Sequence, residues 1–391
     1  MKVSGDWMTG QGTQALCAVL SAGGHQALFV GGCVRNALLG EAVADIDLST
    51  DALPLRVTEL CQAAGFRVIP TGMDHGTVTV VAGGVAHEVT TFRRDVETDG
   101  RRAVVAFTDD IAQDAMRRDL TMNALYARAD GTVVDPLDGL PDLLARRVRF
   151  VGDAGERIAE DALRILRFFR FHAWYGDPGE GLDAEGLAAC AAGVDLLDGL
   201  SRERVGHELA KLLTAPDPAP SVAAMAQTGV LARILPGSDP RALAPLVHLE
   251  DGVGPDWRRR LAVLALSVDW GDALRLSKQD AARLVTLAQA VQSGEAPAIL
   301  AWRHGSELAR DALLVQSALM GQELPQNWQD SLTQGMAAHF PIKAADLMPE
   351  FQGAALGRQL KHLESAWLDS GFALDRAQLL ALSRGDAQNR S

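Results

Sequence analysis

The stretch LFVGGCVRNALLGEAVADIDLSTD, residues Leu28–Asp51, decides how the rest of this chain is interpreted. Its pattern predicts an apolar strand at Leu28–Val30, a turn at Gly31 and Gly32, a helix start carrying Arg35, and then a second strand. Two glycines between a strand and a helix let the backbone approach a ligand closely, because no Cβ stands in the way. The unpaired N–H groups at the start of the following helix favour phosphate.

Two acidic residues, Asp45 and Asp47, occupy the predicted second strand. One residue separates them, so both carboxylates project from the same face. Two oxygen ligands beside a phosphate cradle suit Mg²⁺ holding a triphosphate. The glycine turn or the pair of aspartates alone would be weak evidence. The prediction of a metal and triphosphate site rests on their order and spacing. A doubly wound dinucleotide-binding enzyme is an alternative, disfavoured because the turn lacks the third spaced glycine and an acidic strand follows.

Together, these motifs resemble the signature of the nucleotidyltransferase superfamily. Within it they are most similar to the tRNA nucleotidyltransferase (CCA-adding enzyme) and bacterial poly(A) polymerase family. That family reads GG-x-VRD-x-LLG followed by D-x-D, and this chain has Asn36 where the family has Asp. The resemblance implies that Asp45 and Asp47 bind Mg²⁺ and act in catalysis, and that the triphosphate is gripped by Gly31, Gly32 and Arg35.

Composition sets broad limits on the class of protein. The chain has 391 residues, 48% hydrophobic and 22% charged, which is typical of a soluble globular protein with several domains. Its net charge of −13 argues against a broad, unspecific nucleic-acid binder. It leaves a tRNA enzyme open, since phosphate binding depends on local basic patches.

Nothing in the sequence indicates export or a membrane. The apolar runs are far shorter than the roughly 20 residues that span a bilayer, and the first residues lack an apolar signal core. The cysteines show neither CxxC pairs nor metal-ligand spacing; they are Cys17, Cys33, Cys61 and Cys190. We therefore expect a cytoplasmic protein with reduced thiols.

Three β-type runs follow, at Phe66–Pro70, Gly76–Val81 and Val85–Phe92. In the last run, alternation places Glu88 on the opposite face from His87, which makes Glu88 a candidate third catalytic carboxylate. A solvent-facing glutamate on a strand is the alternative. The family resemblance favours the catalytic role, since the family keeps an acidic residue on this strand.

The segment Arg93–Ala112 is polar, charged and without periodicity, and we expect a mobile loop. In the family a flexible loop follows the catalytic strand and helps the switch between CTP and ATP. An insert without a role is the alternative.

Polar residues then interrupt an apolar stretch at Arg117–Ala127, RRDLTMNALYA. Two arginines, an Asp and an Asn need a reason to approach a core, and a salt-bridge cluster would be one. The stretch also resembles the family's RRDxTxNA motif. This resemblance implies that the triphosphate and ribose are held by Arg118, Asp119 and Asn123.

The stretch Arg157–Trp174, RIAEDALRILRFFRFHAW, predicts one amphipathic helix. Its polar side carries Glu160, Asp161, Arg164, Arg167 and Arg170, and a solvated face of ion pairs is one interpretation. The stretch also matches the family's EDxxR motif. The resemblance implies that Asp161 and Arg164 read the base, with Arg167 and Arg170 behind them or on phosphate.

Such a pair would distinguish bases by hydrogen bonding. Cytosine and adenine both present an exocyclic amine donor beside a ring-nitrogen acceptor, whereas uracil and guanine reverse this pattern. A carboxylate with an arginine therefore admits C and A and leaves buried polar groups unpaired with U or G.

We expect an α+β head of mixed sheet and helices, followed by an all-helical half, because helix signals dominate after Gly181. The expected parts are a nucleotidyltransferase head (1–136), a neck with the base-recognition helix (137–205), a body (206–310) and a tRNA-binding tail (311–391). The resemblance implies addition of CCA to tRNA from CTP and ATP by a monomer, with a dimer left open. A poly(A) polymerase, a CC- or A-adding enzyme and a non-catalytic RNA-binding homologue are the alternatives.

Overall fold

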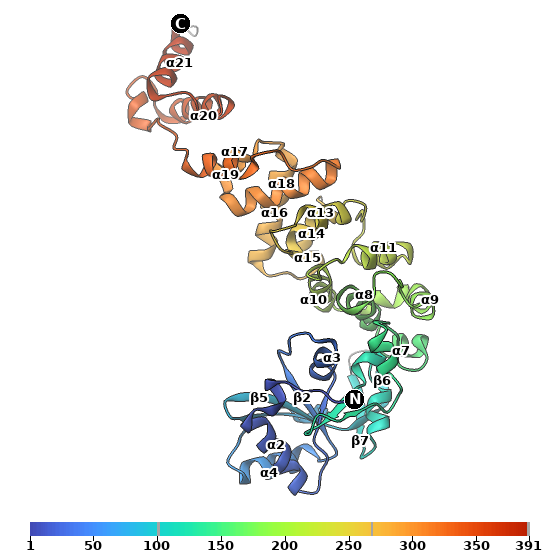
Figure 1. Ribbon diagram of the computed structural model, residues 1–391. Coiled ribbons are helices and arrows are strands. Elements are labelled where there is room, and N and C mark those ends of the chain that lie inside the picture. Colours follow the sequence, from blue (N-terminus) through green and yellow to red (C-terminus); the bar gives the residue numbers. More distant parts are fainter. Residues whose placement is uncertain (100–101, 267–268, 389–391) are drawn as a thin grey trace. The chain divides into compact units, whose positions relative to one another are not determined.

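A computed structural model of the chain describes residues 1–99, 102–266 and 269–388. The chain divides into two compact units, Met1–Ser238 and Asp239–Ser391, drawn from blue to red in Figure 1. The first unit contains all the strands described below, and the second unit is helical among its described residues.

The head is built on one mixed sheet with the strand order β3-β4-β5-β2-β1-β8-β9. Strands β2 and β5 run parallel, and the other neighbouring pairs are antiparallel. The bounds are β1 Leu28–Val30, β2 Ile46–Thr50, β3 Arg67–Gly72, β4 Thr77–Ala82, β5 Val85–Thr91, β8 Tyr126–Arg128 and β9 Val133–Val134. The predicted strands at 28–30, 66–70, 76–81 and 85–92 are therefore confirmed, and Asp45 lies just before β2.

Helices α2 and α4 pack against the sheet, and α3 follows the glycine turn next to β1 and β2 (Figure 1). A core beneath β1 joins Phe92, Tyr126 and Val151 to the strand, which fixes the polar segment around residues 114–123 beside the sheet. The short elements of the head are α1 Asp6–Thr9, α2 Gln11–Ala22, α3 Gly32–Leu39, α4 Pro54–Ala63, η1 Met73–His75, α5 Ile111–Met116, η2 Thr121–Asn123 and α6 Leu140–Leu144.

The expectation of a loop at Arg93–Ala112 is wrong. Strand β6 (Arg93–Asp99) pairs antiparallel with β7 (Arg102–Phe107), and α5 begins at Ile111. A two-stranded ribbon forms through its backbone, so charged side chains do not prevent the pairing. The β-branched and aromatic residues of the sequence RAVVAF favour a strand. Residues 100 and 101 lie outside the described residues.

The expectation of one helix over Arg157–Trp174 is also wrong. The structure has α7 (Ala154–Glu160) and α8 (Leu163–Tyr175), with Asp161 between them in an extended conformation. The Asp161 carboxylate accepts the Leu163 N–H at 3.1 Å. An aspartate that caps a new helix start competes with continuation of the preceding helix.

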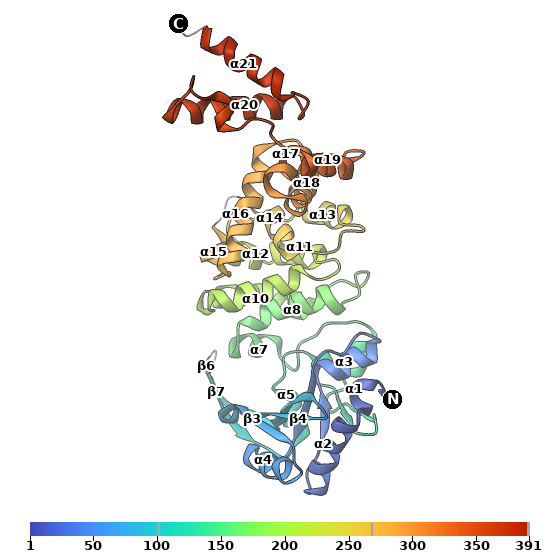
Figure 2. The same cartoon turned by 90° about the vertical axis from the view of Figure 1, so that its left-hand side faces the viewer.

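After Val134 the helices are the regular elements of the described residues, apart from an isolated β-bridge between Leu120 and Phe150. Figure 2 shows α8 and α10 side by side. An α+β head followed by a helical half is confirmed; the four segment boundaries predicted above remain a prediction. The helices after α8 in the first unit are α9 Ala184–Ala192, η3 Val194–Gly199, α10 Arg202–Leu213, α11 Ala219–Gln227 and α12 Val230–Ile234. Those of the second unit are α13 Leu243–Leu249, α14 Trp257–Leu264, α15 Trp270–Ala273, α16 Lys278–Ser293, α17 Pro297–His304, α18 Ser306–Met320, α19 Trp328–Ala337, η4 Ala344–Leu347, α20 Gly353–Asp369 and α21 Arg376–Gln388.

The second unit buries charge as well as apolar surface. Arg259 is 1% exposed and forms ion pairs with Glu250 and Asp311 at 2.7 and 2.8 Å. Arg260 shares Glu250 at 2.7 Å. Removing either carboxylate of this ion-pair cluster would leave a buried arginine charge uncompensated, which is destabilising. None of the helices in the described ranges has the length and apolar character needed to cross a membrane.

Candidate active site

Three carboxylates lie near the point where β2 and β5 pair. The parallel register places Asp47 directly opposite Glu88, and Asp45 precedes β2 by one residue. Burial, then the charge of Glu88, raises the pKa of Asp47 from 3.8 to about 6; Arg118 opposes this shift, and Asp45 adds to it. The negative charges of Asp47, Glu88 and Asp45 are therefore only partly balanced by the positive charge of Arg118.

This set of ligands fits a divalent cation. Among the described residues, no three Asp, Glu, His or Cys side chains are close enough together to form a complete metal site. Magnesium commonly takes only one or two protein carboxylates and completes its coordination with water and substrate phosphates. The position of Asp45 and Asp47 beside the glycine turn matches that arrangement.

Replacing Asp47 by asparagine is expected to stabilise the metal-free protein at alkaline pH. A carboxyl group whose pKa is raised in the folded state holds its proton there after the unfolded chain has lost it, so stability falls as pH rises from about 4 to about 6. The amide does not ionise and avoids this loss, on the order of 1–3 kcal/mol. Thermal unfolding in EDTA should show the variant above wild type at pH 8 and level with it near pH 3.5. Equal unfolding temperatures of the variant and the wild type at pH 8 would contradict the idea that the Asp47 charge destabilises the folded protein.

Two arginines border the glycine turn. Gly31 has φ 69° and ψ −119°, a conformation that favours glycine. A Cβ built on Gly31 would lie 3.5 Å from Arg118 Nη1, and one on Gly32 would lie 3.8 Å from Arg35 Nη2. Two guanidinium groups and the start of α3 therefore surround a turn without side chains, which suits the phosphates of a nucleotide.

The Asn36 side chain holds Arg35. Its Oδ1 accepts from Arg35 Nε at 3.1 Å and Nη2 at 2.9 Å, while its Nδ2 donates to the Ala42 carbonyl at 2.8 Å. The structure thus gives a role to the residue that departs from the family motif. The neutral amide orients the arginine without neutralising its charge.

A buried cluster fixes Arg118. Asp114 is 0% exposed, and its carboxylate accepts from Arg118 Nη2 at 3.1 Å and from the Tyr126 hydroxyl at 2.7 Å. Burial alone would raise the pKa of Asp114, but the charges of Arg118 and Arg117 lower it. The carboxylate therefore stays ionised and holds both arginines at the edge of the sheet.

Asp119 and Asn123 connect the head to α8. Asp119 accepts from Arg167 Nε at 2.6 Å and from Asn123 Nδ2 at 3.0 Å, and Asn123 Oδ1 accepts from Arg35 Nη1 at 2.5 Å. Although burial opposes it, Arg167 lowers the pKa of Asp119 to about 2. The predicted residues Arg35, Asp119, Asn123 and Arg167 thus form one contact network.

The three arginines of α8 have separate carboxylate partners rather than a common solvated face. Arg164 pairs with Glu160 and also donates to the Arg117 carbonyl at 3.2 Å. Arg170 Nε donates to Glu208 on α10 at 2.6 Å. With Arg167 bound to Asp119, the helix is joined to α7, to the head and to α10.

Asp161 lies before α8 and Arg164 within it, so the two side chains are not on one continuous helix as the sequence predicted. Asp161 Oδ2 accepts from Arg204 Nη2 at 2.7 Å, and Asp161 Oδ1 caps α8. The helix break at Asp161 is the physical reason, because it turns the carboxylate towards the start of α10. The two predicted base-reading residues nevertheless lie at the same junction between α7 and α8.

Five residues of this network were missed in the sequence: Asp114, Tyr126, Tyr175, Arg204 and Glu208. Two of them carried a local signal. Tyr175 follows Arg167 and Phe171 at intervals of four along the helix, and Asp114 precedes Arg117 and Arg118 by three and four residues. The others depend on contacts between separate segments.

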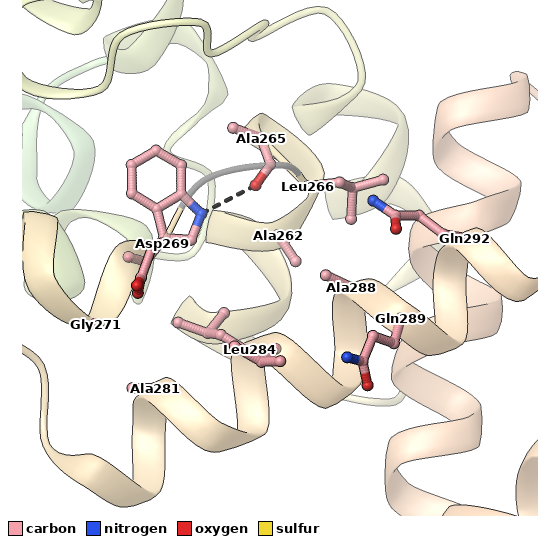
Figure 3. Close-up of a pocket in the computed structure, with 12 residues that line it drawn as sticks. Ala262, Ala265, Leu266, Asp269, Gly271, Ala281, Leu284, Ala288, Gln289 and Gln292 are labelled. Atoms are coloured by element: carbon pink, nitrogen blue, oxygen red, sulfur yellow. Dashed lines mark hydrogen bonds between the residues drawn. The ribbon is translucent and has the colours of Figure 1, made fainter.

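A cavity of about 470 Å³ lies elsewhere, within the second unit, between α14, α15 and α16 (Figure 3). Trp270 lines the cavity and donates its indole N–H to the Ala265 carbonyl at 3.0 Å. The described residues of the lining are mostly small and apolar and include Asp269 but no arginine or lysine. The cavity therefore lacks the cationic groups that the phosphates of a nucleotide need.

Comparison with known proteins places this site in a family. Residues 27–149 match the family model of the Poly A polymerase head domain, and residues 182–241 match that of the probable RNA and SrmB-binding site of polymerase A. The CCA-adding enzyme of Limosilactobacillus fermentum is 31% identical over 389 residues, covering 91% of this chain and 92% of that enzyme. This chain belongs to the CCA-adding enzyme family.

Other members of the CCA-adding enzyme family match different shares of the chain. The mitochondrial CCA tRNA nucleotidyltransferase 1 of Mus musculus is 44% identical over 205 residues, 52% of this chain. The matched part spans 47% of that relative, about half its length. The crystal structure of the Bacillus stearothermophilus CCA-adding enzyme in complex with CTP has a TM-score of 0.74 and 28% identity, covering 97% of this chain and 98% of that one.

Proposed function

We propose that this chain adds C, C and A in turn to the 3′ ends of tRNA, using CTP and ATP and releasing pyrophosphate. The observation that carries the proposal is the register that sets Asp47 against Glu88 beside a glycine turn bordered by Arg35 and Arg118. Carboxylates for a metal and cations for a triphosphate are the two groups that nucleotidyl transfer needs in one place.

In the reaction, the 3′-hydroxyl oxygen of tRNA bonds to the α-phosphorus, and the bond from that phosphorus to the bridging oxygen of the β-phosphate breaks. Arg35 and Arg118 bind the phosphates, and Asp119 and Asn123 position the sugar. Glu88 supports the metal site and accepts the hydroxyl proton. Asp45 and Asp47 would hold Mg²⁺, which when bound lowers the pKa of the hydroxyl and balances phosphate charge.

Base choice is assigned to Asp161 and Arg164. Each Asp161 oxygen accepts one hydrogen bond, from Leu163 or Arg204, and keeps a lone pair for the amine of C or A. Within the described residues, the contacts of Arg164 leave its Nε–H and one Nη2 hydrogen for the ring nitrogen. Both side chains therefore keep hydrogen-bonding capacity for a base while they hold their present partners.

Relatives support the same substrates. A solved Bacillus stearothermophilus relative contains CTP, and a Thermotoga maritima CCA-adding enzyme of TM-score 0.68 is complexed with tRNA. We assign tRNA to this chain as partner, with the helical half holding the acceptor arm through its shape and phosphates. Action in the cytoplasm as a monomer is part of the proposal.

Single-nucleotide reactions test this function against its alternatives. On tRNA lacking CCA, CTP alone should add two residues, and ATP alone should add none; on tRNA ending in CC, ATP should add one. Extension of tRNA lacking CCA by ATP alone, or a run of A on tRNA ending in CC, would indicate a poly(A) polymerase. A CC- or A-adding enzyme would perform only its own step, and a non-catalytic homologue would bind tRNA and extend nothing.

Shortening the segment 93–112 is expected to impair addition of the terminal A more than addition of the two Cs. This ribbon of β6 and β7 follows β5, the strand of Glu88, and in the proposal it assists the change from CTP to ATP. Replacing residues 95–105 by a short Gly-Ser turn and measuring each step separately would test it. An equal decrease in the rates of C addition and A addition would show that the segment supports only the fold or general nucleotide binding.

A further inference from the structure

Arg35 lies among aromatic side chains of α8. Its guanidinium carbon is 4.2 Å from the ring centroid of Tyr175 and 5.1 Å from that of Phe171. Its Nη2 also donates to the Tyr175 hydroxyl at 2.9 Å. The side chain is 7% exposed, so its charge is held largely out of water.

The partners that hold Arg35 in the described structure are all neutral. They are the Asn36 amide, the Asn123 amide and the Tyr175 hydroxyl, together with the two aromatic rings. An aromatic face attracts a cation without cancelling its charge, whereas a carboxylate partner would cancel it. The guanidinium is thus fixed in place with its charge available to an anion.

The Tyr175 contact closes a ring of interactions between α8 and the head. Arg167, two turns earlier on α8, binds Asp119, which is joined through Asn123 to Arg35. The helix therefore holds the segment beside the glycine turn at two points. Loss of the Tyr175 side chain would remove one acceptor of Arg35 Nη2 and the ring beside the guanidinium, so the group beside Gly32 would be held less firmly, by Asn36 and Asn123.

We propose that Tyr175 is a positioning residue for the triphosphate of the incoming nucleotide. It acts through Arg35, holding Nη2 beside Gly32, and so contributes to recognition of the phosphates and not of the base. The inference rests on the proposed function for the identity of the substrate. It predicts that substitution at Tyr175 weakens CTP and ATP by the same factor.

Calorimetric titration with inorganic tripolyphosphate, CTP and cytidine tests this role. Tyr175→Phe keeps the ring and removes the hydroxyl, and the dissociation constants for tripolyphosphate and CTP should rise about threefold to tenfold. Tyr175→Leu removes both contacts, and the same constants should rise about tenfold to thirtyfold. Affinity for cytidine should stay at the wild-type value in both variants.

Trp174→Leu is the matched control. Trp174 is the neighbouring aromatic residue on α8, but its indole N–H donates to the Lys211 carbonyl on α10. This variant should bind tripolyphosphate as the wild type does. Wild-type affinity in Tyr175→Leu, or an equal loss for cytidine and tripolyphosphate, would overturn the positioning role.

The outcomes separate this inference from the function on which it rests. A chain that binds tripolyphosphate in a Tyr175-dependent manner but extends no tRNA would defeat the proposed function alone. A chain that adds CCA while its Tyr175 variants keep wild-type affinity for tripolyphosphate would defeat the positioning role alone.

Discussion

Replacing Asp47 by alanine is expected to reduce nucleotide addition by about 10³-fold or more, and Asp45→Ala should do the same. Both carboxylates lie at the point where β2 meets Glu88, and the charge on Asp47 is costly enough in the free protein to raise its pKa to about 6. A group kept in an unfavourable state by the fold is typical of a functional site.

The aspartate substitutions should slow the chemical step of nucleotide addition without changing tRNA binding or stability. The metal balances charge that develops in the transition state, so tRNA affinity should stay near the wild-type value. Single-turnover addition of C, thermal unfolding and tRNA binding would be measured together. Glu59→Ala on the exposed side of α4 is the control and should retain activity. Near-normal turnover in both aspartate variants would remove the catalytic role of this stretch.

Asp161→Ala is expected to relax base selection. Without the carboxylate, Arg164 still donates, and UTP and GTP each offer it a carbonyl acceptor. In the wild type, binding U or G leaves a buried polar group unpaired, and the variant no longer has this free-energy cost. Discrimination against UTP and GTP should therefore fall about tenfold to hundredfold. Addition of C and A should slow, because their amine loses its acceptor. Rates with each nucleotide alone, on tRNA ending before the first C, measure both effects.

The capping role of Asp161 requires its own controls. Asp161→Asn keeps an oxygen for the Leu163 N–H, and its amide can also donate to U or G, so it too should lose discrimination. Asp183→Ala removes an equivalent cap from α9, where the carboxylate accepts the Gly186 N–H at 2.9 Å. It should lower stability and leave base choice intact. A uniform slowing of all four nucleotides in Asp161→Ala would make the residue structural.

Local pattern was enough to predict much of the head. The strands around Gly31 and Glu88, and the placement of Asp45 and Asp47 on one segment, follow from alternation and turn residues. Sequence alone did not give the parallel pairing of β2 with β5, because strand order depends on contacts distant in sequence. That pairing is what sets Asp47 against Glu88.

The misjudged segments have two physical causes. The charged residues of β6 suggested a loop, but backbone pairing with the valine-rich β7 forms a strand. The apolar periodicity around Arg164 suggested a continuous helix, but the capping bond of Asp161 begins a new one. Arg204 acquires its role only through the approach of α10 to α8, which no local pattern encodes. The spacing of Tyr175 places it on the side of Arg167, but its contact with Arg35 depends on the approach of α3.

Sequencing of product 3′ ends tests the central claim most directly. Transcribed tRNA lacking CCA would be incubated with Mg²⁺ and all four nucleoside triphosphates, using the wild-type chain and Asp47→Asn in parallel. The account predicts tRNA ending in CCA and no further residues with the wild type, and unextended tRNA with the variant. Unextended tRNA with the wild type, a run of A, or CCA addition by Asp47→Asn at the wild-type rate would contradict it.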